Sequence, residues 1–173
     1  MKIAVVGFAG SGKSTLAREL GEICHAPVLH LDSVHFLPNW VERDPAEERR
    51  MVEDFLDSHS SWIIDGNYRK LCYERRLAEA DAIWILLFDR ATRLLRVCRR
   101  YRQYRGKTRP DMAEGCSEKL DGAFVRWVLW DGCTPEKDER MRDIVRQYPK
   151  KAHLFTYQKQ LDAALRLFRE GRL

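Results

Sequence analysis

The sequence contains no hydrophobic stretch long enough to cross a membrane. Its apolar runs are short, as at residues 82–88, and none approaches the roughly 18 to 20 uninterrupted apolar residues that a spanning helix needs. Nothing near the start resembles an export signal. We therefore expect a cytoplasmic protein with no membrane partner.

Cysteines are few, odd in number and far apart. The five lie at positions 24, 72, 98, 116 and 133, a spacing that fits neither a CxxC metal site nor a small disulfide framework. The sequence also lacks repeats, linkers and low-complexity tracts. With 173 residues, 45% of them hydrophobic, it predicts one compact domain over residues 1–173.

Acidic residues are missing from one segment. Between positions 90 and 109 there are nine Lys or Arg residues and no acid, within a chain whose net charge is +5. Such density is typical of proteins that bind anions, whether nucleotides or nucleic acids. No helix-turn-helix, zinc finger or RNA-binding signature accompanies it.

Short apolar runs alternate with helical patterns along the whole chain. The runs at 3–6, 28–31, 62–64, 82–88 and 152–156 predict five strands of a parallel sheet, with helices on both faces. Helices are expected from Lys13, from Pro45, and at 69–80, 92–104, 118–130, 135–147 and around 161–168. The fold class is therefore α/β. Ligands of such sheets bind at the carboxyl ends of the strands.

The segment GFAGSGKS follows the first strand and matches the pattern GxxxxGK[ST]. Glycines let successive N–H groups curl around a phosphate, and the following helix adds a favourable dipole. Lys13 would reach the β- and γ-phosphates of ATP, and the Ser14 hydroxyl would hold Mg²⁺. The predicted nucleotide-binding residues are Gly7, Gly10, Ser11, Gly12, Lys13, Ser14 and Thr15.

An acidic residue directly follows the apolar run of the third predicted strand. Asp65 comes directly after Trp62-Ile63-Ile64, the pattern that delivers a carboxylate to the magnesium shell. An aspartate that only caps a turn is the alternative.

Three segments resemble adenylate-kinase-like enzymes in order and spacing: GFAGSGKS, WIIDGNYR at 62–69 and FDRATRLLRVCRR at 88–100. More closely, HLDSVHFLPNW, WIIDGNYRK and YRGKTRPDMAEGCSEKLD resemble the FlaR-like "DNA topology modulation protein" group of P-loop proteins. The resemblance implies a P-loop NTPase fold like that of nucleoside-monophosphate kinases, with a flap at about 33–60 and a short lid at about 101–117.

The same resemblance implies roles for individual residues. Asp65 and Arg69 fall where these kinases place a magnesium-shell carboxylate and an arginine for the acceptor phosphate. Arg96 and Arg100 match the arginine pair that flanks the ATP phosphates. Asn67-Tyr68 stands where the family pattern has Phe-Pro, a departure that leaves the acceptor open.

Two further residues are candidates for the acceptor side. Asp32 lies where many small-molecule kinases of this fold keep a carboxylate that orients the acceptor hydroxyl or takes its proton. A turn-capping aspartate is an equal alternative. Trp40 is a candidate for stacking on a base, with simple packing as the alternative. His30 and His35 are expected to be ordinary polar wall residues.

These patterns favour a phosphotransferase that uses Mg²⁺ and moves the γ-phosphate of ATP to a small acceptor, a nucleotide or nucleoside among others. The alternative is an ATP-binding regulator associated with nucleic acid, and a third is ATP binding without transfer. Whether the protein is a monomer or a dimer stays open.

Overall fold

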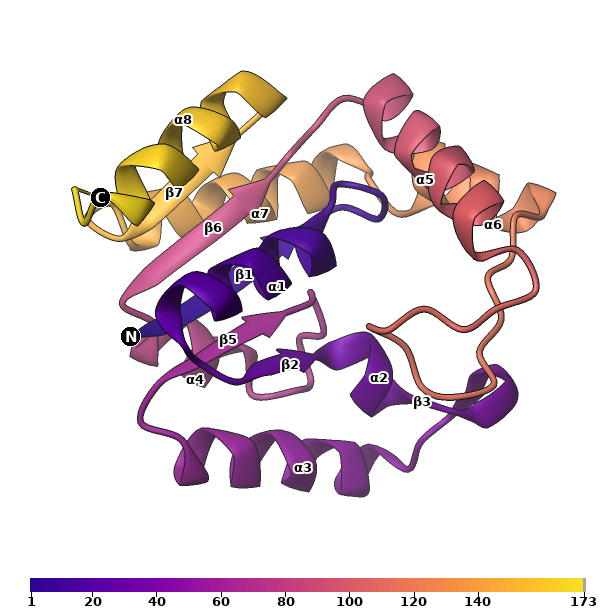
Figure 1. The fold of residues 1–173 in the computed structure, drawn as a ribbon, viewed down its shortest axis with the longest axis horizontal. Helices are drawn as coiled ribbons and strands as arrows, with labels where there is room; N and C mark the ends of the chain where they lie inside the picture. Colours follow the sequence, from indigo (N-terminus) through magenta and orange to yellow (C-terminus); the bar gives the residue numbers. More distant parts are fainter. Residues whose placement is uncertain (173) are drawn as a thin grey trace.

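A computed structural model, which describes residues 1–172, contains a five-stranded parallel sheet of order β2-β5-β1-β6-β7. Figure 1 shows the sheet between two sets of helices. Its strands are β1 (Lys2–Gly7), β2 (Val28–His30), β5 (Trp62–Asp65), β6 (Ala82–Leu86) and β7 (Ala152–Phe155). The predicted fold class is thus confirmed, with the central β1 between β5 and β6.

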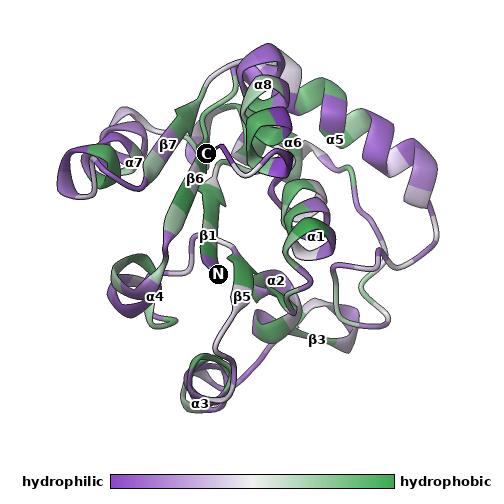
Figure 2. Ribbon diagram, turned by 60° about the vertical axis from the view of Figure 1, so that its left-hand side comes forward, coloured by the Kyte–Doolittle hydropathy of each residue, from purple (hydrophilic) through white to green (hydrophobic). Residues whose placement is uncertain are grey.

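The strands bury both faces, because alternate residues of each strand point to opposite sides. Ile3 and Val5 of β1 belong to the core under helices α1 and α8, whereas Ala4 and Val6 belong to the core under α3, α4 and α7. Figure 2 shows the sheet edge-on between these two layers. The continuous apolar strands predicted from the sequence reflect this double burial.

The α-helices are α1 (Lys13–Cys24), α2 (Leu31–His35), α3 (Pro45–Ser58), α4 (Tyr73–Glu79), α5 (Arg90–Tyr104), α6 (Gly122–Arg126), α7 (Pro135–Gln147) and α8 (Gln158–Arg169). A π-helical turn, Trp127–Asp131, continues α6. A hairpin of β3 (Phe36–Leu37) and β4 (Val41–Glu42) encloses a 3₁₀ turn, Pro38–Trp40. The predicted starts at Lys13, Pro45 and Pro135 are confirmed.

Three predicted elements differ from the structure. The strand predicted over 28–31 ends at His30, so Asp32 lies in the short helix α2. The helix predicted over 69–80 begins only at Tyr73, since Cys72 before it has a left-handed φ of 51°. The helix predicted over 118–130 begins at Gly122, where Asp121 accepts a hydrogen bond from the Phe124 amide. The β3–β4 hairpin was not predicted at all.

Within residues 1–172, no helix combines the length and apolar character that a membrane crossing requires. The five cysteines are free thiols, in keeping with their scattered positions in the sequence.

Candidate active site

The loop between β1 and α1 has the backbone shape of a phosphate-binding loop. Gly7, Gly10 and Gly12 all have positive φ, at 147°, 77° and 95°. A Cβ on Gly7 would lie 2.4 Å from the Leu86 carbonyl oxygen, so no larger residue fits there. Gly12 caps α1 without a side-chain hydrogen bond, which leaves the first N–H groups of the helix for an anion.

Lys13 lies inside this loop with its ammonium facing an uncharged partner. Its Nζ donates to the Phe8 carbonyl over 3.2 Å. Burial lowers the pKa of Lys13, against the opposing charges of Asp32 and Asp65. The Ser11 hydroxyl of the same loop is buried and has no hydrogen-bond partner within the described residues. An unpaired buried donor beside an ammonium suits the oxygens of a phosphate.

Ser14 and Asp65, the two predicted magnesium ligands, meet. The Ser14 hydroxyl donates to Asp65 Oδ2 over 2.9 Å, and His30 Nδ1 lies 2.5 Å from Asp65 Oδ1. Burial acts to lower the pKa of His30, but the hydrogen bond and charge of Asp65 outweigh it and raise that pKa. His30 therefore orients Asp65, a contact that the prediction of an ordinary wall residue missed.

Hydroxyl and carboxylate oxygens are the ligands that Mg²⁺ prefers, and it commonly takes one or two from the protein and the rest from phosphates and water. Within residues 1–172 no three His, Cys, Asp or Glu side chains form a complete metal site. Ser14 and Asp65 thus fit a magnesium ion that arrives with a nucleotide.

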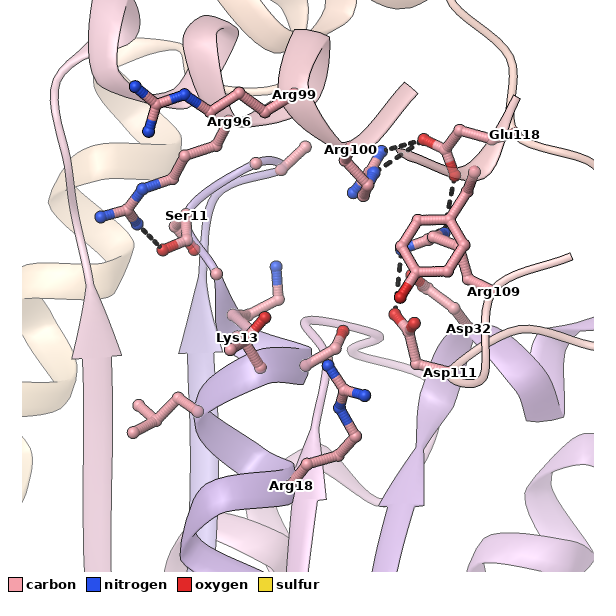
Figure 3. Close-up of a pocket in the computed structure, with 18 of the residues that line it drawn as sticks. Ser11, Lys13, Arg18, Asp32, Arg96, Arg99, Arg100, Arg109, Asp111 and Glu118 are labelled. Atoms are coloured by element: carbon pink, nitrogen blue, oxygen red, sulfur yellow. Dashed lines mark hydrogen bonds and ion pairs between the residues drawn. The ribbon is translucent and has the colours of Figure 1, made fainter. Parts of the chain in front are cut away.

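A cavity of about 1260 Å³ opens at the carboxyl ends of the strands. Figure 3 shows that Lys13, Asp32, Arg96, Arg100, Arg109 and Asp111 border one opening. Of the predicted site residues, the cavity is lined by Gly10, Ser11, Gly12, Lys13, Ser14, Thr15, Asp32, Trp40, Arg96 and Arg100. Residues from the whole length of the chain therefore meet at one rim.

Arg96 of α5 lies against the phosphate-binding loop. One guanidinium nitrogen donates to the Ser11 carbonyl, another donates to Gln158 Oε1 over 2.5 Å, and the group stacks 4.2 Å above the Phe88 ring. Burial lowers the pKa of Arg96, against the charges of Asp162 and Asp89. Its direct hydrogen bonds go to uncharged oxygens.

Arg93, one turn earlier on α5, is buried and contacts the loop from behind. Its guanidinium stacks 5.0 Å from the Phe8 ring and donates to Cys133 Sγ over 3.1 Å. Arg93 thus supports the loop rather than facing the cavity.

Arg100, the other half of the predicted arginine pair, has a different environment. It donates to Glu118 Oε1 over 2.7 Å, and Glu118 Oε2 lies 2.7 Å from Arg109 Nε. Arg109 in turn donates to Asp111 Oδ2 over 2.9 Å. We call these four residues, Arg100, Glu118, Arg109 and Asp111, the lid network. Glu118, Arg109 and Asp111 are buried, so their charges neutralise one another inside the protein.

Asp32 and Trp40 lie on the side of the cavity that α2 and the β3–β4 hairpin form. The Tyr68 hydroxyl donates to Asp32 Oδ1 over 2.8 Å, and burial beside Asp32 raises the pKa of Tyr68 far above its ordinary value. Trp40 packs edge-on against Phe36 at 5.2 Å and donates to the Ser117 carbonyl over 3.1 Å. All four aromatic or carboxylate groups line the cavity.

Arg69 is not where the resemblance implied. It is exposed, does not line the large cavity, and instead borders an adjoining cavity of about 350 Å³ beside α4 and α7, which shares Asn67, Trp127 and Gly132 with the large one. The chain turns after Asn67, because Leu71 N–H bonds to the Tyr68 carbonyl over 3.3 Å, and this turn carries Arg69 away from the large cavity. Its predicted contact with an acceptor phosphate has no support in this geometry.

Two organising residues had no signal in the sequence. Asn67 Oδ1 accepts from Gly7 N–H over 3.0 Å, and its Nδ2 donates to the Gly7 carbonyl over 2.6 Å. Arg76 is fully buried and donates to the carbonyls of Leu71, Tyr68 and Gly66. Asn67 therefore joins the loop after β5 to the loop after β1, and Arg76 holds the shape of the former.

The sequence and the fold were compared with those of known proteins. No protein-family model matches the sequence, and no curated protein matches it. Among solved structures, TT1252 from Thermus thermophilus matches with a TM-score of 0.56 and 17% identity, over 100% of this chain and 98% of its own. A candidate kinase from Chloroflexus aurantiacus matches with a TM-score of 0.54 and 14% identity, over 98% and 97%.

Shikimate kinase from Acinetobacter baumannii, solved with shikimate, matches with a TM-score of 0.49 and 17% identity, over 99% of this chain and 94% of its own. At such identities the likeness concerns the fold. The chain thus shares its α/β fold with TT1252 and with the Chloroflexus aurantiacus protein, which agrees with the fold that the resemblance implied. Membership of the FlaR-like group stays a prediction.

Proposed function

We propose that the protein is a phosphotransferase that binds ATP with Mg²⁺ and moves the γ-phosphate to a small acceptor. The observation that carries the proposal is the meeting of Lys13, the Ser14–Asp65 pair and Arg96 around one glycine loop at the rim of the cavity. A loop built only to connect strand and helix needs neither a buried ammonium nor an unpartnered buried hydroxyl.

Each residue has a distinct task. The N–H groups at the start of α1 and the Lys13 ammonium bind the β- and γ-phosphates. Ser14 and Asp65 would hold Mg²⁺, which would neutralise negative charge on the phosphates. Arg96 stabilises the negative charge that spreads over the equatorial oxygens as the phosphoryl group moves.

Asp32 faces the other reactant. With Oδ1 occupied by the Tyr68 hydroxyl, its Oδ2 has no hydrogen-bond partner within the described residues. This oxygen can accept the hydrogen of an acceptor hydroxyl, which orients that hydroxyl for in-line attack and gives its proton a destination.

Removal of the Lys13 ammonium tests the proposal. Lys13→Ala should lower the rate of ADP release from Mg·ATP by about 10³ or more, because a single well-placed cation contributes that much to phosphoryl transfer. Circular dichroism and thermal melting should show that the variant still folds. ATP turnover equal to that of the wild type would refute the mechanism.

A second function, an ATP-binding regulator associated with nucleic acid, has one observation in its favour. Three arginines of α5, and Arg105 directly after it, are exposed and form no ion pair within residues 1–172; the three are Arg90, Arg99 and Arg102. Binding through such a face would be non-specific and would weaken steeply with added salt. It requires measurable affinity for duplex DNA at physiological salt that falls in an Arg99→Ala/Arg102→Ala variant.

A further inference from the structure

We propose that the acceptor is a hydroxyl compound with a flat, uncharged ring and no phosphate group of its own, of which a nucleoside is the simplest example. The inference rests on the phosphotransferase proposed above and concerns the acceptor side of the same cavity. An uncharged acceptor is expected because the arginines on this side form ion pairs with carboxylates.

The arginines on the acceptor side already have carboxylate partners. Arg100 and Arg109 share Glu118 at 2.7 Å each, and Arg109 also binds Asp111 at 2.9 Å. Two guanidinium groups therefore face two carboxylates, and Asp32 adds a further negative charge. An acceptor phosphate placed here would meet carboxylates instead of unpaired arginines, and like charges held close together disfavour binding strongly.

The other arginine that a phosphorylated acceptor would use is absent from this side. Arg69, which corresponds by resemblance to the acceptor-phosphate arginine, lies at a different cavity. Asn67 holds the start of its loop on Gly7 through two hydrogen bonds, and in this conformation the Arg69 side chain borders the other cavity.

Four exposed cations, Arg18, Arg99, Lys119 and Arg166, also line the cavity, and none of them forms an ion pair within residues 1–172. Lys119 lies 5.7 Å from the centre of the Trp40 ring. Exposed cations on flexible side chains contribute little to the binding of an anion. They are nevertheless the groups that a phosphorylated acceptor would have to recruit, which makes them useful in a test.

The remaining surface suits a ring and a hydroxyl. Phe36, Trp40 and Tyr68 line the cavity beside Asp32, and aromatic faces bind flat rings by stacking. The Tyr68 hydroxyl stays protonated, because burial beside Asp32 raises its pKa, and so keeps Asp32 Oδ1 occupied. Asp32 Oδ2 then presents one acceptor for one hydroxyl.

The proposed step balances without any other reactant. The acceptor oxygen forms a bond to Pγ while the bond from Pγ to the β,γ-bridging oxygen breaks, and its electron pair stays on ADP. The hydroxyl proton passes to Asp32 and then to water. The products are a phosphate monoester, ADP and a proton.

A comparison of matched acceptors with the wild-type protein tests the proposal. Each common nucleoside, in ribose and deoxyribose form, is paired with its own 5′-monophosphate, and ADP release and phosphorylated product are measured with Mg·ATP. We expect kcat/KM for at least one nucleoside to exceed that for its monophosphate by about 100-fold or more, given the repulsion from Asp32 and the carboxylate partners of Arg100 and Arg109. Arg18→Ala and Lys119→Ala should leave the ratio of the two kcat/KM values within about 2-fold, since exposed cations add little to the binding of an anion.

Three results would overturn the inference. One is a monophosphate used as well as its nucleoside, which would also be expected to lose activity in Arg18→Ala. Another is phosphorylation of a ring-free polyol in preference to every nucleoside. The third is Lys13-dependent hydrolysis of ATP that no nucleoside or nucleotide accelerates, an outcome that leaves the proposed use of ATP standing. Absence of ATP binding would refute both proposals together.

Discussion

Arginine or lysine side chains lie on two walls of the same cavity, but their hydrogen-bond partners differ between the walls. On the wall of the phosphate-binding loop, Lys13 and Arg96 donate to uncharged oxygens of Phe8, Ser11 and Gln158. On the lid wall, Arg100 and Arg109 contact the carboxylates of Glu118 and Asp111. Positive charge is therefore available on the first wall and neutralised on the second.

This difference separates binding of an anion from maintenance of structure. A buried cation whose partners are carbonyls gains from an incoming phosphate, because charge-assisted hydrogen bonds replace neutral ones. A buried cation with a carboxylate partner is already compensated, and loss of that partner leaves an uncompensated charge. The triphosphate of the proposed reaction would therefore bind at the first wall, whereas the ion pairs of the second wall stabilise the segment that contains Arg109 and Glu118.

The strongest test of the comparison removes a carboxylate from the lid wall. Glu118→Gln should lower the free energy of unfolding by about 3–5 kcal/mol, because the buried Arg109 and the partly buried Arg100 then lose their shared carboxylate. Urea unfolding measures the effect. Glu114→Gln, at an exposed position of the same segment, is the matched control and should stay close to the wild type. Equal stability of the two variants would contradict the structural role of the lid network.

The opposite change removes a cation from the loop wall. Arg96→Ala should lower kcat by roughly 10²-fold while the Kd of ATP changes less, since its charge acts mainly on the transition state. Steady-state kinetics and calorimetric titration separate the two quantities. Arg102→Ala, exposed on the same helix and outside the cavity lining, serves as control. If Arg96→Ala weakened ATP binding and left kcat unchanged, Arg96 would be a binding residue only.

A neutral residue of the loop wall should matter less than its charges. Asn67→Ala removes two hydrogen bonds to Gly7, each worth about 0.5–1.5 kcal/mol, so the Kd of ATP should rise by about 10-fold. Calorimetry gives the Kd, and thermal melting shows whether the fold persists. An unchanged Kd would mean that Gly7 keeps its conformation without the clamp.

The smallest expected effect is a dependence on pH. Burial acts to raise the pKa of Asp111, but the charge of Arg109, which also donates a hydrogen bond to this carboxylate, opposes it, and the pKa lies below its ordinary value. A lowered pKa in the folded state means that ionised Asp111 stabilises the protein fully above its unfolded value of about 3.9. The contribution disappears as the pH falls through the folded value.

Unfolding of the wild type and of Asp111→Asn between about pH 2 and pH 6 measures this contribution. The two proteins should differ most above the unfolded pKa of Asp111 and converge at the acid end. Asp54→Asn, at an exposed position, should follow the wild type throughout. A difference that grows as the pH falls would reverse the sign of the interaction.

Local patterns in the sequence were enough to predict the sheet and the loop. GFAGSGKS and the apolar run before Asp65 are each a short continuous segment, so the residues of each segment determine its local backbone conformation. The parallel arrangement of the strands then brings the carboxyl ends of both strands to the same edge of the sheet. The predicted helix starts at Pro45 and Pro135 are also local signals, and the residues before them, Asp44 and Thr134, accept amide hydrogen bonds.

Pairing across the lid could not be predicted in this way. The basic segment 90–109 indicated anion binding, but whether Arg100 faces a phosphate or Glu118 depends on how residues 105–121 fold back, which no periodicity encodes. The misplacement of Arg69 has a similar cause, because a turn of a few residues after Asn67 decides which cavity it reaches. Glu118 and Asp111 lie within YRGKTRPDMAEGCSEKLD, but nothing in that segment indicates that they pair with Arg100 and Arg109.

The clamp of Asn67 on Gly7 also bears on motion. Two hydrogen bonds fix the entry of the phosphate-binding loop to the strand that carries Asp65, so these loops should fluctuate as one body. A flexible loop loses conformational entropy when it binds its ligand, but here most of that entropy is already lost when the protein folds. Gly7 N–H should accordingly exchange with deuterium slowly even without nucleotide, while any closing movement falls to the hairpin and the lid.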